Sequence, residues 1–149
     1  MKIEEEIKQE KFRNEYQKAT INLLFSYSWL LKRHKDFFKR FGITEQQYNV
    51  LRILNGQFPD AISTSEIKKR MLDVNSDSSR IVDRLALKGL VTKRICRNDK
   101  RLVDVLISKK GLDMLGKIDR HSSELDGIVS NLTIEEAKDL SELLDKMRN

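Results

Sequence analysis

The sequence predicts a mainly α-helical protein with one small β-hairpin, and three observations support this class. Apolar residues recur every three or four positions over residues 6–41, 112–129 and 134–147, which is the spacing of one helical face. Over residues 102–107 the period falls to two, as in a half-buried strand. At three places a Ser or Thr is followed three positions later by Gln or Glu, the capping-box spacing that marks a helix start.

The first predicted element is one long helix over residues 6–41. Gly42 ends it, because glycine adopts the left-handed capping conformation without steric cost. A second apolar row, at Leu24, Leu31 and Phe38, runs beside the main one. Such a wide apolar stripe needs more partner surface than a small three-helix core supplies, which indicates dimerisation through this helix.

Three shorter helices are predicted next, over residues 44–56, 63–71 and 76–88. The first two begin at capping boxes, and the third is expected to be capped by Asn75. Gly89 ends the third helix, whose outward side is rich in Ser and Arg.

A two-stranded hairpin is predicted from residues 90–96 and 102–107, joined by the turn residues Asn98-Asp99. Helix resumes at Ser108, and a capping box at Thr133 begins the last helix. Helix, helix, helix, hairpin is the order of a winged helix-turn-helix. The fold class is therefore mainly α with a small β-hairpin wing, flanked by long N- and C-terminal dimerisation helices.

This order divides the chain into three functional segments of one intertwined domain. Residues 1–42 are expected to form the N-terminal dimerisation helix. Residues 43–110 would form the DNA-binding lobe, and residues 111–149 the C-terminal dimerisation helices.

The positive charge of the chain is concentrated in its middle third. The 149-residue chain has a formal net charge of +6. Residues 61–110 hold 13 Lys and Arg against six Asp and Glu, whereas the other 99 residues hold 16 against 17. A basic segment that coincides with a winged helix indicates a polyanionic partner, double-stranded DNA.

The helix over residues 76–88 is the predicted recognition helix, the one that enters the major groove. Serine hydroxyls can contact phosphates or bases at close range, and arginine can bind guanine through two hydrogen bonds. The outward-facing candidates for DNA contact on this helix are Ser76, Ser79, Arg80 and Arg84.

Residues 97–111 resemble the wing signature of the MarR-type transcriptional regulators, Asp-x-Arg-x-x-x-Val-x-Leu-Thr-x-x-Gly. The signature positions are filled here by Asp99, Arg101, Val105 and Gly111. Ile107-Ser108 replaces the common Leu-Thr, and keeps an apolar residue followed by a capping hydroxyl. Residues 79–91 resemble the recognition helix and first wing strand of the same family, and the flanking helices agree in number and order.

The resemblance implies a homodimer whose terminal helices interlock and whose two recognition helices bind a palindromic operator, most often as a repressor. It also implies that Arg101, at the wing tip, enters the minor groove and that Asp99 orients its guanidinium. Further phosphate contacts are expected from Arg94, Arg97 and Lys100.

Many relatives bind small aromatic effectors between the dimerisation helices and the winged-helix lobe. The corresponding pocket residues here are Tyr27, His34, Phe38, Phe41 and Tyr48. The same aromatic stripe, at helical spacing, is also what a plain hydrophobic core would require.

Two alternative functions remain open at the level of the sequence. A winged helix can serve as a protein–protein interaction module, although this wing carries Arg and Lys where such a module needs apolar surface. The other alternative is a thiol-based redox switch through Cys96, the single cysteine, which lies near Arg94 and Arg97.

Other function classes lack their motifs. No nucleophile elbow, Walker loop or dinucleotide fingerprint occurs, so neither an enzyme nor a cofactor is expected. His34 and His121 are the only histidines and have no clustered ligands, so no metal site is expected. Without a signal peptide or an apolar run of membrane-spanning length, a cytoplasmic protein is expected.

Overall fold

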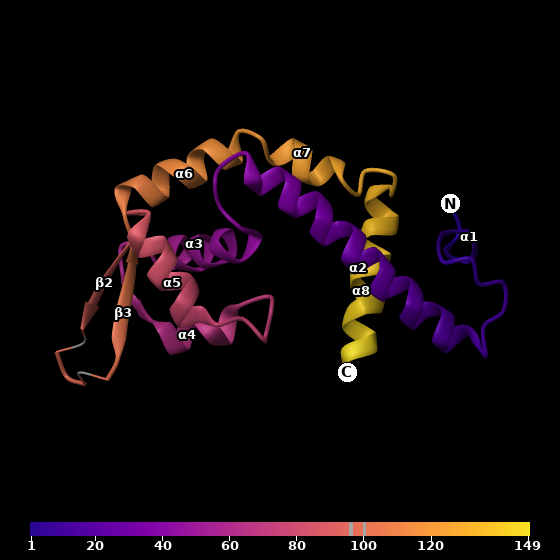
Figure 1. The fold of residues 1–149 in the computed structure, drawn as a ribbon, viewed down its shortest axis with the longest axis horizontal. Helices are drawn as coiled ribbons and strands as arrows, with labels where there is room; N and C mark the ends of the chain where they lie inside the picture. Colours follow the sequence, from indigo (N-terminus) through magenta and orange to yellow (C-terminus); the bar gives the residue numbers. More distant parts are fainter. Residues whose placement is uncertain (96, 100) are drawn as a thin grey trace.

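The computed structural model describes residues 1–95, 97–99 and 101–149, in which one small sheet lies at one end of a mostly helical fold (Figure 1). This architecture confirms the predicted mainly α class with a hairpin wing. In chain order the elements are α1 (Ile3–Glu6), α2 (Glu15–Lys39), α3 (Glu45–Gln57), β1 (Ile62–Ser63), α4 (Thr64–Arg70), α5 (Ser78–Leu87), β2 (Val91–Ile95), β3 (Val103–Ile107), α6 (Lys109–Asp119), α7 (Ser122–Gly127) and α8 (Ile134–Arg148).

The predicted single helix over residues 6–41 is wrong at its N-terminal end. Residues 7–14 separate α1 from α2, and Lys8 has φ of 55°, in the left-handed region that a right-handed helix excludes. The Asn14 side chain caps α2 by accepting a hydrogen bond from the Gln17 N–H at 2.9 Å. The helix with the wide apolar stripe therefore begins at α2, and the chain turns after it at Gly42, where φ is +70°.

Four other helix starts, those of α3, α4, α6 and α8, lie where capping residues predict them. The hydroxyls of Thr44, Ser63, Ser108 and Thr133 each accept a hydrogen bond from the backbone N–H three residues later. Each cap satisfies one of the N–H groups that a helix leaves unpaired at its start. These caps fix α3, α4, α6 and α8.

Strands β2 and β3 form the predicted hairpin, with Val91 opposite Ile107 and Ile95 opposite Val103. The short strand β1 pairs with the other edge of β3 and completes a three-stranded antiparallel sheet in the order β1-β3-β2. Sequence reasoning missed β1, because two residues are too few to establish a period.

The core lies in the winged-helix lobe, between α3, α4, α5, the sheet and the ends of α2 and α6. Its most buried large side chains are Phe38, Val50, Leu51, Leu54, Ile67, Val82, Leu85, Leu90, Val105 and Ile118. The N-terminal part of α2 and the whole of α8 lie away from this lobe (Figure 1). Among the described helices, none is both long and apolar enough to cross a membrane.

Candidate nucleic-acid interface

The recognition helix begins two residues later than predicted. Its N-cap is Asp77, whose carboxylate accepts a hydrogen bond from the Arg80 N–H at 3.1 Å, and not Asn75. Asn75 belongs to a turn built around Asp73, whose carboxylate accepts a hydrogen bond from the Asn75 N–H at 2.9 Å.

Ser76 therefore does not face outward, and its placement on the exposed side of the helix was wrong. Its side chain is buried, with 5% of the residue exposed. The hydroxyl donates to the Asp73 carbonyl at 2.6 Å, which ties the turn together ahead of α5. Ser76 supports the helix that follows it and presents no group to a partner.

Helix α5 is divided into a buried and an exposed side, as its periodicity predicts. Ser79, Arg80 and Arg84 are exposed. The buried side faces the lobe and consists of Ser78, Ile81, Val82 and Leu85. The two guanidinium groups thus stand on the side of the helix that is free to enter a groove.

The wing carries further cations. Arg94 and Arg97 are exposed, the first on β2 and the second in the turn that follows it. Two of the residues singled out in the sequence, Cys96 and Lys100, lie outside the described residues.

Asp99 and Arg101 are in contact at the tip of the wing. The Asp99 carboxylate accepts hydrogen bonds from the Arg101 backbone N–H at 3.0 Å and from its Nε at 3.2 Å. The backbone N–H, and then the guanidinium, hold the pKa of the Asp99 carboxyl below its ordinary value. The Arg101 side chain is nevertheless 91% exposed, so its cation is oriented without being covered.

Two lysines that the sequence reasoning did not single out join the parts of this surface. Lys93 on β2 pairs with Asp83 on α5, Nζ to Oδ1, at 2.5 Å, which joins the wing to the recognition helix. Lys88, at the end of α5, donates to the Gly42 carbonyl at 2.6 Å and to Gln47 Oε1 at 3.0 Å. These contacts join residues 10 to 46 positions apart, and no short motif records them.

A hollow of about 300 Å³ lies between α2, α3 and α7. It contains three of the predicted pocket residues, His34, Phe38 and Tyr48. His34 Nδ1 lies 2.8 Å from Glu45 Oε1, which connects α2 to α3 at its edge. Arg52 also lines it, with its Nε donating to the Tyr48 hydroxyl at 2.9 Å.

The other two predicted pocket residues lie outside its lining. Tyr27 is exposed on α2, two helical turns and about 10.5 Å along the axis from His34. Phe41 packs against the core, with its ring centroid 5.7 Å from that of His121. In the part of the chain that the structure describes, no three His, Cys, Asp or Glu residues are grouped to hold a metal ion.

Known proteins share the helix-turn-helix and the hairpin wing of this chain. Residues 41–102 match the profile of the MarR family. The crystal structure of a MarR transcription factor from Planctomyces limnophilus is 26% identical and covers 91% of this chain and 98% of its own, with a TM-score of 0.71. The winged-helix lobe of this chain therefore matches the MarR family. The match in sequence falls on the winged-helix lobe, and the match in fold extends to the terminal helices.

Two other proteins are similar to this chain. The transcriptional repressor MprA of Escherichia coli is 27% identical over 105 residues, 69% of this chain and 60% of MprA. This chain therefore spans about three fifths of the length of that repressor. A mutant MarR from E. coli, solved in complex with operator DNA, shares the fold with a TM-score of 0.79 over 93% of this chain and 99% of its own, at 24% identity.

Proposed function

We propose that this chain is a MarR-family transcriptional repressor that binds a palindromic operator as a homodimer. The observation that carries the proposal is the exposed Arg101 guanidinium, held at the wing tip by Asp99. A narrow A·T-rich minor groove has an enhanced negative potential and favours an inserted arginine. The matching role for α5, with Arg80 and Arg84 outward, is readout of the adjacent major groove.

The terminal helices support the dimer. Many large apolar side chains stand exposed on α2 and α8, and so much exposed apolar surface on two helices indicates an interaction surface. A second copy of the chain would cover them, with residues 1–42 and 111–149 as dimerisation segments and residues 43–110 as the DNA-binding lobe. The exposed apolar residues are Tyr16, Leu24, Phe25, Tyr27, Trp29 and Leu31 on α2, and Ile134, Leu140, Leu143 and Met147 on α8.

Fluorescence anisotropy tests the proposal with two duplexes, the DNA just upstream of the chain's own gene and a scrambled version. A dimer that neutralises roughly 6–10 phosphates loses about 10³–10⁵ in affinity between 50 and 200 mM salt. We expect such a steep salt dependence together with a preference for the upstream duplex. No binding to either duplex at low salt would refute DNA binding and favour the protein-contact module.

We further propose that a small aromatic molecule controls this repressor through the hollow at His34, Phe38 and Tyr48. The hollow lies between the dimerisation helix α2 and the winged-helix lobe. A bound molecule can therefore change the distance between the two recognition helices of the dimer. Related folds have been solved with such molecules, including an organohalide-sensing regulator in a 2,4-dichlorophenol-bound form. A ligand can release DNA only if it binds the DNA-incompetent arrangement more tightly.

Screening phenolic compounds for a shift in melting temperature, and then for release of bound DNA, tests this second proposal. A compound that shifts both should lose its effect in Tyr48→Ala. An effect of equal size in that variant would place the ligand elsewhere.

A further inference from the structure

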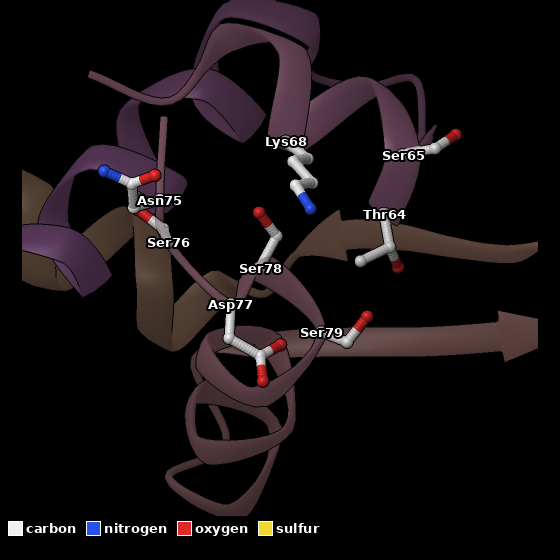
Figure 2. Close-up of a pocket in the computed structure, with 8 residues that line it drawn as sticks. All are labelled: Thr64, Ser65, Lys68, Asn75, Ser76, Asp77, Ser78 and Ser79. Atoms are coloured by element: carbon white, nitrogen blue, oxygen red, sulfur yellow. The ribbon is translucent and has the colours of Figure 1, made fainter. Parts of the chain in front are cut away.

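A second hollow, of about 420 Å³, lies where α4 approaches the N-terminus of α5 (Figure 2). Every residue that lines it has a polar side chain, with hydroxyl groups from both helices and one ammonium group, that of Lys68. Thr64 is already used, because its hydroxyl donates to the Val103 carbonyl at 3.4 Å. The Ser65 hydroxyl lies 3.0 Å from that of Ser63. The Ser76 hydroxyl donates to the Asp73 carbonyl. Figure 2 shows the Asn75 amide nitrogen directed away from Lys68. Lys68, Ser78 and Ser79 are the remaining candidates for binding a ligand.

Ser78 is the most informative member of the lining. Only 3% of the residue is exposed, and its Oγ has no hydrogen-bond partner among the described residues. A buried hydroxyl without a partner destabilises the folded state, so it needs an explanation. The cap of α5 does not supply one, because Asp77 performs that role. Figure 2 shows the hydroxyl pointing towards the end of the Lys68 side chain, while the oxygen itself is covered by neighbouring atoms.

Lys68 differs from the lysine beside it. Lys69 pairs with Glu66 at 2.5 Å, whereas Lys68 forms no ion pair in the described part of the chain. Figure 2 shows its ammonium group reaching across the hollow towards α5. The first N–H groups of that ten-residue helix add the positive end of its dipole, which favours an anion.

Asp77 supplies the only carboxylate among the described lining residues, and this carboxylate does not lie between Lys68 and Ser78. Its oxygen accepts from the Arg80 N–H, and Figure 2 shows the carboxylate turned away from the Lys68 ammonium and the Ser78 hydroxyl. The pair that faces the hollow consists of hydrogen-bond donors. An ammonium, a hydroxyl and a helix N-terminus together suit a tetrahedral oxyanion.

We propose that this hollow binds a phosphate group of the DNA backbone, with Lys68 Nζ and Ser78 Oγ as its ligands. The proposal rests on the proposed function, and assigns it a contact on each protomer beside the recognition helix. Because the Ser78 oxygen is covered here, binding includes a rotation about χ1 to another staggered position. A phosphate held at the start of α5 fixes the depth and register of that helix without reading sequence.

The test compares Lys68→Ala and Ser78→Ala with the matched control Lys69→Ala, in the full-length protein and on both duplexes. Each of the first two variants should weaken binding about tenfold for each protomer's contact, and by the same factor on either duplex, as the loss of a charge-assisted hydrogen bond predicts. In a plot of log affinity against log salt concentration, Lys68→Ala should also make the slope less steep by about 0.9 per protomer. Ser78→Ala removes no charge and should leave this slope unchanged. Lys69→Ala should change the affinity by about twofold or less, through screened long-range charge alone.

Two further arms identify the source of the phosphate. Duplexes with one neutral methylphosphonate at each position in turn should reveal a linkage that weakens the wild type but not Lys68→Ala. If a free phosphate is the occupant instead, inorganic phosphate at constant ionic strength should raise the melting temperature of the wild type but not of Lys68→Ala, and no methylphosphonate position should show that selective loss.

The outcomes separate this inference from the function on which it rests. Lys68→Ala and Ser78→Ala variants that fold normally and bind DNA like Lys69→Ala would overturn the phosphate site while leaving the regulator intact. If the wild type binds neither duplex, the proposed function fails, and the experiment with inorganic phosphate decides whether the phosphate site exists. A phosphate-dependent rise in melting temperature that Lys68→Ala abolishes would retain the site, and no rise would overturn it.

Discussion

Gly111, near the start of α6, is expected to be the glycine that this fold tolerates least as alanine. The residue is buried, and a Cβ placed on it would lie 2.3 Å from the Leu90 carbonyl oxygen and 2.7 Å from Ile107 Cγ1. That carbonyl cannot retreat freely, because it accepts the Ser108 N–H at 3.1 Å beside the start of α6. The close approach explains physically why the wing signature has glycine at this position.

Three contributions determine how much Gly111→Ala changes the free energy of unfolding. Overpacking costs about 1–3 kcal/mol, and weakening the hydrogen bond between Ser108 and Leu90 costs about 1 kcal/mol. The better helix propensity of alanine returns about 0.5–1 kcal/mol. Gly111→Ala should therefore lower the free energy of unfolding by about 2 kcal/mol, a fall of roughly 4–8 °C in melting temperature.

Gly116, in the same helix, is the matched control. A Cβ there meets nothing within 4 Å, so Gly116→Ala should gain about 0.5–1 kcal/mol. Urea unfolding followed by circular dichroism, at one fixed protein concentration, measures both variants against the wild type. Equal stability of the two variants would refute the packing argument at Gly111.

Four other predictions address the wing, the dimer and the turn before α5. Arg101→Ala should weaken DNA binding by about tenfold or more in anisotropy while the dimer persists in sedimentation; unchanged affinity would exclude the wing from recognition. By NMR, the pKa of the Asp99 carboxyl should lie below its ordinary value of 3.8. Its contribution to stability is therefore present at neutral pH and is lost as the pH falls through the lowered pKa. Arg101→Ala keeps the backbone N–H, which is the larger cause, and should restore that pKa only in part. Leu143→Glu, which charges a position 63% exposed on α8, should shift light scattering towards the monomer, and an unaltered dimer would place the interface elsewhere. Ser76→Ala removes the hydroxyl that donates to Asp73 and should lower stability by about 1 kcal/mol in urea; no loss would contradict its structural role.

Most of the winged-helix lobe follows from local rules. Capping hydroxyls at Thr44, Ser63 and Ser108 determine where helices begin, and the change of period after Gly89 marks the wing. These signals depend on residues within three or four positions of one another, so the sequence displays them directly. The contact between Asp99 and Arg101 is also local and was expected from the resemblance.

The errors occur where one local rule competes with another. At the N-terminus the helical period continues through residues 6–14, but Asn14 satisfies the first turn of α2 and the chain breaks before it. In the turn before α5, Asp73 accepts the Asn75 N–H and the Ser76 hydroxyl, so Asp77 becomes the cap and Ser76 is buried.

Long-range features were not accessible to sequence reasoning for a different reason. The Lys88 contact to Gly42 and the hollow between Lys68 and Ser78 depend on the packing of helices against one another. No spacing within one element encodes that packing.

Hydroxyl-radical footprinting on duplexes that the protein selects from a random library at low salt tests the central claim most directly. A dimer of winged helices predicts two symmetric protected half-sites, with centres about 34–36 Å apart along the duplex, and a protected minor groove beside each. The Arg101→Ala variant should lose the minor-groove protection first. Failure to enrich any duplex, or protection of one isolated half-site, would contradict a homodimer that reads a palindromic operator.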